Sequence, residues 1–283
     1  MILVVDSGST KTDWLMIFPN AKTTLTHTMG FNPYFHNPEK IYTELTKKEF
    51  TDIIPLTEIT QVFYYGAGCP DDYYRQIIHQ GLKQVFLNAK IEVAHDLLGA
   101  ARATCGHSPG IAGILGTGSN SCLYDGNKIT DNVMALAHVL GDEGGGVHLG
   151  RLTLQAYYYR ELPKDLNDQF ENDYPEDKNA IIHRIYGEGQ NVHIAHFAQF
   201  LIRNRTHPFA KQLIKQAFRE FAVRHLKKYQ GWENLEVNLV GSVAGLLSEE
   251  LKEVFTEENL KLGRIIRKPI EELANYHVEG IRL

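Results

Sequence analysis

The order of apolar and polar positions in the first third of the chain predicts a small sheet followed by alternating helices and strands. β-rich apolar runs at 2–5 and 13–18 flank a polar turn, so a hairpin is expected, and residues 22–29 alternate like a third strand. The other expected elements are helices over 37–48, 71–86 and 97–104 and strands over 61–69 and 90–96. Asn37 before Pro38 favours a helix start. The pattern up to about residue 108 predicts a mixed sheet with helices packed on it.

The pattern then starts again, which predicts a second domain of similar plan. Residues 110–128 read as strand, polar turn and strand, closed by a tight turn at 125–127. The later expected elements are helical material at 149–162, a polar irregular stretch at 162–179, an amphipathic helix over 207–229, a strand running into a Gly-rich turn at 235–245, and a short strand and helix around Pro269. Ser7-Gly8-Ser9-Thr10 falls on Thr117-Gly118-Ser119-Asn120 when the halves are overlaid. Two related domains facing each other across a cleft are expected.

Composition and charge narrow the class of protein. The chain has 283 residues, 43% hydrophobic and 22% charged, with a net charge of −5, so no basic footprint points to nucleic acid. Strand material begins at Ile2, and no apolar run approaches the ~20 residues that span a bilayer. The three cysteines have no C-x-x-C spacing. We expect a soluble, cytoplasmic protein that binds neither nucleic acid nor membrane.

The two matching turns have the composition of an anion site. A turn of Gly, Ser and Thr exposes backbone N–H groups and hydroxyls, which together bind phosphate. Neither a P-loop nor a G-x-G-x-x-G pattern is present, because Thr10 precedes Lys11-Thr12 and the last glycine is missing elsewhere. Asp6 ends the strand before the first turn, where a carboxylate suits Mg²⁺ held between it and phosphate. The alternative is a solvated Asp in an Asx-turn.

Three further stretches carry candidate chemistry. Asp96 follows a strand and leads into a helix, so it is either a helix cap or a general base that takes a proton from a hydroxyl. Asp142-Glu143 precede three glycines and read either as a helix start or as acceptors for a hydroxyl-rich ligand. VGSVAG at 240–245 suits a close approach of backbone to a flat ligand, and the alternative is a helix cap by Ser242. The pair His193 and His196 is read as surface histidines, and 165–177 as a solvated loop.

These motifs resemble those of the superfamily of actin, hexokinase and the 70-kDa heat-shock proteins. DSGSTKTD is similar to its first phosphate motif, GTGSNS to its second, and LVGSVAG to its adenosine motif. Within it, HDLLGA, ILGTGSN, LGDEGGG and GFNP resemble the N-acetylglucosamine kinase group of the BadF/BadG/BcrA/BcrD-type ATPase family. The resemblance implies two ribonuclease-H-like domains, each a mixed five-stranded sheet with flanking helices, with ATP and substrate in the cleft. The domains would cover 1–110 with 268–283, and 111–267.

The resemblance also implies roles for single residues. Asp96 would be the catalytic base, and Asp6 would organise Mg²⁺. The residues implied for ATP are Ser9, Thr10, Lys11, Thr117, Gly118, Gly241, Ser242 and Gly245. The residues implied for the sugar are Asn32, Ser119, Asn120, Asp142 and Glu143. The activity implied is ATP-dependent phosphorylation of the primary hydroxyl of an amino sugar, with N-acetylglucosamine favoured and a homodimer left open.

Two departures and two alternatives remain. The family's Gly-Gly-Trp-Gly before the acidic motif is replaced by ALAHVLGDEG, which keeps another amino sugar such as N-acetylmuramate open, and Ser7 stands where many sugar kinases have Gly. The same ATPase family includes activators of CoA-ester dehydratases and reductases that hold an iron–sulfur cluster, for which Cys69 and Cys105 are the plausible donors and Cys122 is expected to be buried. A sugar-sensing regulator would need a DNA-binding segment, for which the chain has neither spare length nor basic charge.

Overall fold

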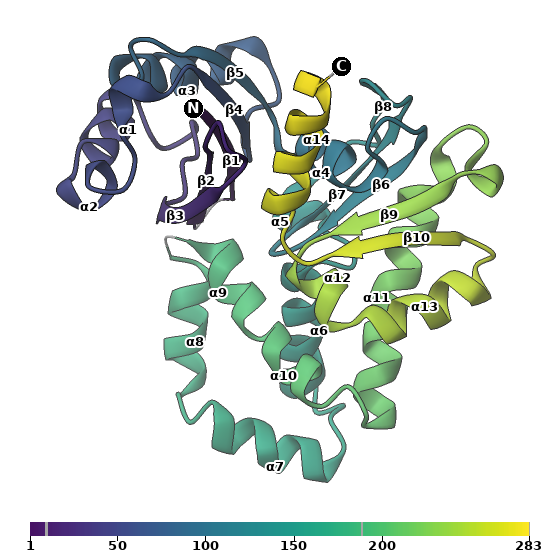
Figure 1. The fold of residues 1–283 in the computed structure, drawn as a ribbon. Coiled ribbons are helices and arrows are strands. Elements are labelled where there is room, and N and C mark those ends of the chain that lie inside the picture. Colours follow the sequence, from purple (N-terminus) through teal and green to yellow (C-terminus); the bar gives the residue numbers. More distant parts are fainter. Residues whose placement is uncertain (9–10, 188, 283) are drawn as a thin grey trace. The chain divides into compact units, whose positions relative to one another are not determined.

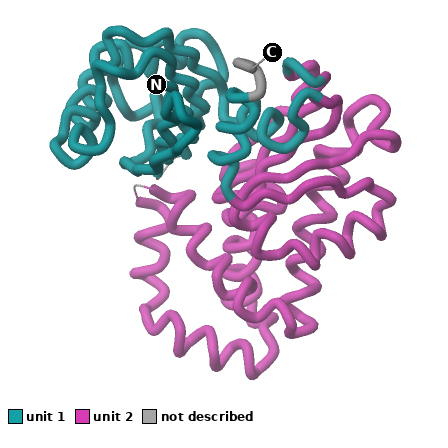
Figure 2. Tube along the Cα trace, viewed as in Figure 1, with its two compact units in different colours: residues 1–107, 126–128, 268–283 teal, residues 108–125, 129–267 magenta. Residues whose placement is uncertain are grey.

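The computed structural model describes residues 1–8, 11–187 and 189–282 and divides the chain into two compact units (Figures 1 and 2). Unit 1 holds 1–107, 126–128 and 268–283, and unit 2 holds 108–125 and 129–267. This division differs from the expected domains at 108–110 and 126–128. Each unit is built on one five-stranded mixed sheet, which confirms the expected fold class.

The sheet of unit 1 has the strand order β3-β2-β1-β4-β5. The strands are β1 (Ile2–Ser7), β2 (Lys11–Ile17), β3 (Thr23–Met29), β4 (Gln61–Gly66) and β5 (Lys90–His95). The helices are α1 (Pro38–Leu45), α2 (Lys48–Thr51), α3 (Asp72–Val85), α4 (Asp96–Cys105) and α14 (Ile270–Arg282). The expected hairpin is confirmed, because β1 pairs antiparallel with β2 and parallel with β4.

Alternation along β1 explains why helices cover both faces of this sheet. Leu3 and Val5 belong to the apolar cluster that α1 and α3 cover, whereas Val4 belongs to the cluster shared with α4 and α14. Successive side chains of a strand point to opposite faces, so a strand that is apolar throughout is buried on both. Asn37 accepts a hydrogen bond from the backbone N–H of Lys40, which confirms the expected start of α1.

A buried chain of hydrogen bonds holds α14 to the sheet of unit 1. Arg102 Nη1 donates to the hydroxyl of Tyr65 (2.7 Å) and to Glu92 Oε1 (3.0 Å). The Tyr65 hydroxyl lies 2.8 Å from His277 Nε2. Since Arg102 has only donors, the tyrosine must donate to His277, which fixes a neutral imidazole. The His277 ring also stacks on Phe63 at 3.7 Å. Burial, with a smaller contribution from the Arg102 charge, lowers the pKa of His277 to about 3.

This pKa predicts a loss of stability in acid. Below pH 6.5 the unfolded chain binds a proton at His277 that the folded chain refuses until about pH 3, so stability falls across that window. We expect the free energy of unfolding of wild type to drop between pH 7.5 and pH 5 by about 2 kcal/mol more than that of His277→Gln, at ~1.4 kcal/mol per pH unit below 6.5. Urea melts of both proteins at the two pH values measure the difference. Equal slopes would show that His277 is protonated in the folded state.

Unit 2 repeats the plan of unit 1. Its sheet has the order β10-β9-β6-β7-β8, and β6 pairs antiparallel with β7 and parallel with β9, as β1 does with β2 and β4. The strands are β6 (Gly110–Leu115), β7 (Ser119–Tyr124), β8 (Ile129–Asp131), β9 (Glu236–Val240) and β10 (Lys261–Ile266). The repeated plan that the sequence overlay predicted is therefore present.

The helices of unit 2 are α5 (Ala137–Leu140), α6 (Gly146–Tyr158), α7 (Lys164–Asp173), α8 (Lys178–Ile185), α9 (Gln190–His196), α10 (Ala198–Arg203), α11 (Pro208–Arg224), α12 (Ser242–Leu246) and α13 (Ser248–Glu257). All of them except α5 and α9 contribute side chains to one large apolar cluster with β6 and β9. The solvated loop expected at 165–177 is wrong, since α7 runs through most of it. Leu166 and Phe170, four residues apart, are buried on one face of α7. Two apolar residues are enough to pack this helix onto the cluster, because its other faces meet water.

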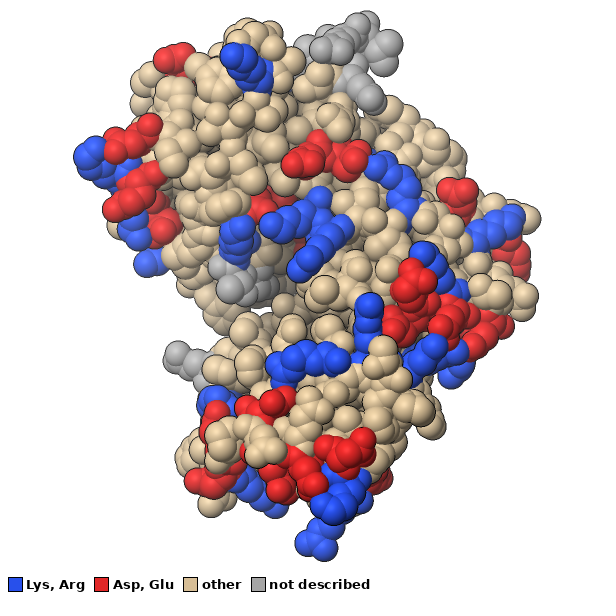
Figure 3. Space-filling view, turned by 60° about the horizontal axis from the view of Figure 1, so that its bottom comes forward, with Lys and Arg blue, Asp and Glu red and all other residues tan. Residues whose placement is uncertain are grey.

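Charged side chains of both signs are interspersed over the face that Figure 3 shows. Several of the ion pairs join α11 to α13, such as Lys211 with Glu253 (2.6 Å) and Arg219 with Glu257 (2.7 Å). Exposed pairs of this kind contribute little stability because water and salt screen them. Among the described residues, no helix combines the length and the apolar character that crossing a membrane requires.

Candidate functional site

The predicted residues of unit 1 lie at one edge of its sheet, where three parallel strands end. Ser7 of β1 is level with Gly66 of β4, and Gly66 is level with His95 of β5. Asp6 and Asp96 therefore lie at the same carboxyl edge, two strands apart. Ligands of open α/β sheets bind at this edge because loops and helix N-termini converge there.

Asp6 occupies an electrostatically unfavourable position. Burial, followed by the negative charges of Asp96 and Asp13, raises the pKa of Asp6 to about 7. A cation near Asp6 would favour its charged form. The described residues contain no cluster of three or more His, Cys, Asp or Glu arranged to hold a metal ion. The buried Asp6 carboxylate by itself fits Mg²⁺, which is held by one or two carboxylates and otherwise by water and phosphate oxygens.

Asp96 does not cap its helix, so that alternative is wrong. The N-cap of α4 is His95, whose Nδ1 accepts the N–H of Leu97 (3.1 Å), and Asp96 is the first helical residue. Asp96 Oδ1 lies 2.8 Å from the same Nδ1 and, although buried, has no hydrogen bond of good geometry. His95 was not among the residues predicted from the sequence, although it stands beside Asp96 at the end of a predicted strand.

Two buried hydroxyls, those of Ser7 and Thr12, flank the turn that is predicted to bind phosphate in unit 1. Ser7 Oγ lies 2.8 Å from Thr12 Oγ1 and accepts the N–H of Phe31 (3.2 Å), while Gly8 donates to the carbonyl of Lys11 (3.0 Å). Ser7, which stands where many sugar kinases have glycine, therefore has a structural role, because its hydroxyl bonds to Thr12 and Phe31. The predicted ATP ligands Ser9 and Thr10 lie outside the described residues.

Two more predicted residues of unit 1 have partners within the unit. The ammonium of Lys11, half exposed, pairs with Asp13 at 2.8 Å. Asn32 Oδ1 accepts the N–H of Tyr34 (3.0 Å) and lies against Gly68, whose positive φ of 75° and lack of a Cβ let the loop after β4 approach. Among the described residues the amide nitrogen of Asn32 makes no hydrogen bond, so it is available to donate to a ligand.

In unit 2 the second phosphate turn is joined to the acidic glycine motif by backbone hydrogen bonds. Gly146 N–H donates to the carbonyl of Gly116 (2.9 Å), and Val147 N–H donates to that of Thr117 (2.8 Å). These are orphan donors of the first turn of α6, so the turn caps the helix. A Cβ on Gly145 would lie 2.7 Å from the carbonyl of Gly118. The Thr117 side chain remains exposed.

Asp142 stands directly beside this turn. Its Oδ1 accepts the N–H of Ser119 (3.0 Å), and a side chain on Gly118 would collide with it. Burial raises the pKa of Asp142, although the Ser119 hydrogen bond opposes the shift. Asp142 has a positive φ of 61°, a strained conformation that is typical of functional positions. The buried hydroxyl of Ser119 has no hydrogen-bond partner among the described residues, so it is available to a ligand.

The other two predicted sugar residues of unit 2 are already engaged. Asn120 Oδ1 accepts from the N–H of Ser121 (2.9 Å) and from Asn132 Nδ2 (3.1 Å). Glu143 is buried and meets His225 Nε2 (3.1 Å) and Arg224 Nη1 (3.3 Å) of the α11 region. Burial acts against the charged form, but a backbone hydrogen bond, His225 and Arg224 hold the pKa of Glu143 below its usual value. Glu143 therefore anchors the loop before α6, a role that the sequence did not predict.

The adenosine motif lies next to the second phosphate turn. Val240, the last residue of β9, pairs with Ile114 of the neighbouring strand β6. Gly241 after β9 and Gly116 after β6 therefore lie at the same edge of the sheet. Gly241 has a φ of 125°, and a Cβ there would collide with the carbonyl of Leu115. The helix cap by Ser242 is wrong: the N-cap of α12 is Gly241, and Ser242 is exposed. Gly245 lies against Arg267.

Of the two cysteines predicted as donors to an iron–sulfur cluster, Cys69 is poorly suited to that role. Burial, with the charge of Asp96, raises the pKa of Cys69 to about 12, whereas a cluster ligand must be a thiolate. Cys122 is buried in β7, as expected. His193 and His196 lie on α9, and neither belongs to a metal-binding cluster among the described residues.

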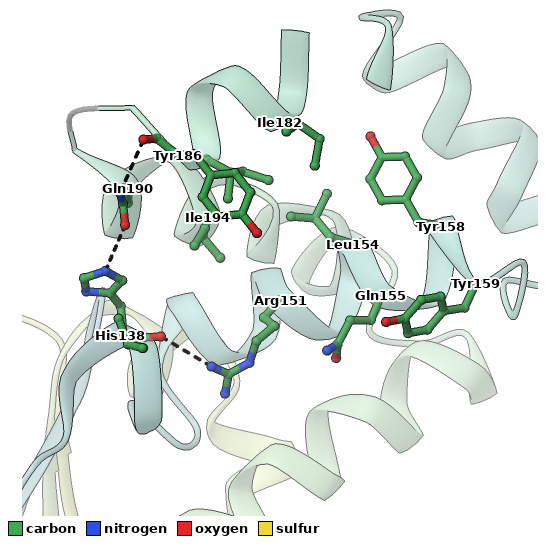
Figure 4. A pocket seen from close by; sticks show the side chains of 12 residues that line it. His138, Arg151, Leu154, Gln155, Tyr158, Tyr159, Ile182, Tyr186, Gln190 and Ile194 are labelled. Carbon is green, nitrogen blue, oxygen red and sulfur yellow. Dashed lines mark hydrogen bonds between the residues drawn. The ribbon is translucent and has the colours of Figure 1, made fainter. Parts of the chain in front are cut away.

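A cavity of about 420 Å³ lies elsewhere in unit 2, between α6, α8 and α9 (Figure 4). Its walls are mainly apolar and aromatic, with Tyr158, Tyr159 and Tyr186 among them. His138 Nε2 lies 3.3 Å from Gln190 Oε1 at one end of it. The residues predicted for ATP and sugar do not line it. We place the candidate site at the strand ends because the exposed turn and the partnerless Ser119 hydroxyl are there.

No protein-family model matches the chain, and no curated protein matches it significantly. Among solved structures, the "Putative N-acetylglucosamine Kinase" of Porphyromonas gingivalis is 37% identical over 99% of this chain and 100% of its own, with a TM-score of 0.94. A protein of the same description from Chromobacterium violaceum is 19% identical over 97% of this chain and 98% of its own, with a TM-score of 0.74. ROK hexokinase from Thermus thermophilus is 16% identical over 99% of both chains, with a TM-score of 0.56.

The two more distant matches support the fold alone. The first is different in kind, because more than a third of the residues are identical across essentially both whole chains. The chain therefore belongs to the same N-acetylglucosamine kinase-like family as the Porphyromonas gingivalis protein.

Proposed function

We propose that this chain is an ATP-dependent kinase that phosphorylates the primary hydroxyl of N-acetylglucosamine. The observation that carries the proposal is the arrangement at the carboxyl edge of unit 2. There the turn 116–118 is joined to the N-terminus of α6, and Gly241 follows the neighbouring strand. The similarity to the Porphyromonas protein supports the choice of acceptor.

In the proposal, unit 2 supplies most of the binding groups. The turn holds ATP phosphates through Thr117 and Gly118, and the glycine-rich stretch at 241–245 borders the adenosine. The Asp142 carboxylate and the Ser119 hydroxyl contact the sugar. Asn120 adds its side-chain amide, and Glu143 acts by anchoring this loop. These fixed groups place acceptors and donors around a polar ligand before it arrives.

Unit 1 supplies the chemistry. Asp96 orients the sugar hydroxyl and takes its proton as the oxygen attacks the γ-phosphorus; the bond between that phosphorus and the β–γ bridging oxygen breaks, and ADP leaves. Asp6 would hold Mg²⁺, which when bound neutralises charge on the phosphates. Asn32 contributes a donor to the sugar, and Ser9, Thr10 and Lys11 contribute to the phosphates. Positioning of this kind supplies most of the catalysis because the transition state of phosphoryl transfer is loose.

An ADP-release assay over several sugars tests the proposal. We expect N-acetylglucosamine to give the highest kcat/KM, with glucosamine and glucose about 10- to 100-fold lower because they lack the acetyl group. N-Acetylmuramate tests the alternative that the missing tryptophan leaves open, and carbon NMR of the product locates the phosphate. ADP release no faster with any sugar than without one would overturn the kinase assignment.

A further inference from the structure

We propose that His95 is a positioning residue for Asp96, donating a hydrogen bond from Nδ1–H to Asp96 Oδ1 and so directing the other carboxylate oxygen toward the acceptor hydroxyl. The proposal rests on the proposed function for the role of Asp96, although the His95–Asp96 pair itself is visible without it. It starts from the distance of 2.8 Å between Nδ1 and Oδ1.

A proton on Nδ1 makes this contact attractive, although the two groups do not yet form a hydrogen bond of good geometry. A nitrogen and an oxygen that both present lone pairs repel each other at hydrogen-bonding distance. Oδ1 is buried and otherwise lacks a hydrogen bond, which is an unfavourable state for a carboxylate oxygen. A proton on Nδ1 resolves both problems. Nδ1 cannot at the same moment accept the N–H of Leu97, so the helix cap and the carboxylate compete for one atom.

The surroundings favour the carboxylate in this competition. Burial and the charge of Arg75 on α3 act against a protonated ring, but the close contact with Asp96 and its negative charge outweigh them and raise the pKa of His95. Across the edge of the sheet, Asp6 on β1 adds negative charge near Asp96, and Cys69 keeps its proton. The backbone N–H of Leu97, by contrast, loses one hydrogen bond at a helix end, where 26% of the side chain of His95 is exposed to water.

Positioning of Asp96 gives His95 an effect on kcat that a helix cap alone would not have. As a base, Asp96 needs one oxygen fixed and one free, and His95 is the described residue that engages Oδ1. A carboxylate rotated by a fraction of an ångström loses much of its effect on the attacking hydroxyl. Removal of the His95 imidazole should therefore lower kcat and leave the KM for the sugar nearly unchanged.

Two substitutions separate positioning from capping. Serine and asparagine are both good N-caps, so His95→Ser and His95→Asn should fold with stabilities within about 1 kcal/mol of wild type. Asparagine also offers an amide N–H close to the place of Nδ1–H. We expect His95→Ser to lower kcat about 10- to 100-fold and His95→Asn to recover most of that loss. Equal kcat in His95→Ser and wild type would overturn the proposal.

The chain contains a matched control for capping. His207 is the N-cap of α11 and accepts the N–H of Phe209 through Nδ1 at 3.1 Å, the same arrangement as at His95. Its carboxylate contact is made by Nε2 to the exposed Asp165. We expect His207→Ser to leave kcat unchanged. A loss of kcat equal to that of His95→Ser would attribute both effects to helix capping and overturn the proposal.

Nitrogen NMR tests the pair without any substrate. In ¹⁵N-labelled wild-type protein we expect His95 to carry its proton on Nδ1, and we expect Asp96→Asn to lower the pKa of His95. A neutral ring protonated only on Nε2 would overturn the proposal whatever the kinetics show. If His95 carries its proton on Nδ1 but no sugar is phosphorylated, the His95–Asp96 pair stands and the proposed function fails. If Asp96→Asn abolishes turnover while His95→Ser does not lower it, the proposed function stands and the positioning role of His95 fails.

Discussion

Asp96→Asn is expected to reduce kcat for sugar phosphorylation about 10²- to 10⁴-fold, the share that a positioned general base supplies. Asparagine has nearly the same shape but cannot take the proton of the attacking hydroxyl. The KM values for ATP and sugar should change little, because the substitution removes an interaction made chiefly in the transition state. Steady-state ADP release at saturating substrates measures the effect.

Stability separates this result from a folding defect. Asp96 is the first residue of α4, where a negative charge stabilises the helix by about 0.3–1 kcal/mol, far less than the expected loss of activity. Asp72→Asn is the matched control, because Asp72 is also the first residue of its helix and is almost fully exposed. Asp96→Asn with more than a third of wild-type kcat would contradict the assignment of the base.

Gly145→Ala is expected to have the second largest effect, because it forces apart two backbone segments of the site. The added Cβ would lie 2.7 Å from the carbonyl carbon and oxygen of Gly118, and backbone cannot yield as a flexible side chain can. The turn 116–118 would separate from the N–H groups of Gly146 and Val147. We expect a destabilisation of about 1–3 kcal/mol and a fall in kcat/KM for ATP of about 100-fold.

Gly116→Ala provides the control for folding in the same turn. A Cβ at Gly116 meets no atom of the described residues within 4 Å, and the backbone there has no positive φ. Its free energy of unfolding should remain within about 0.5 kcal/mol of wild type. Denaturant melts of the two variants, with initial rates over a range of ATP concentrations, make the comparison. A Gly145→Ala protein as stable and active as wild type would show that the turn and α6 are not coupled.

Local sequence determined the strands, the starts of several helices and the places where chemistry gathers. The apolar runs at 2–5 and 13–18 and the polar turn between them need only neighbouring residues to predict a hairpin, and Asn37-Pro38 sets its helix start locally. Polar residues such as Asp6 and Asp96 could be recognised because each ends an apolar strand. Parallel strands then bring those ends to one edge, whatever the rest of the chain does.

Tertiary structure decided what these residues touch. Glu143 became an anchor because α11, about eighty residues later, brings His225 and Arg224 to it. The segment at 165–177 became a helix because Leu166 and Phe170 found a large apolar cluster to complete. Gly145 matters because Gly118 passes close by. Periodicity and capping are set within a few residues of sequence, whereas an ion pair, a covered apolar face or a close backbone approach depends on segments that only folding brings together.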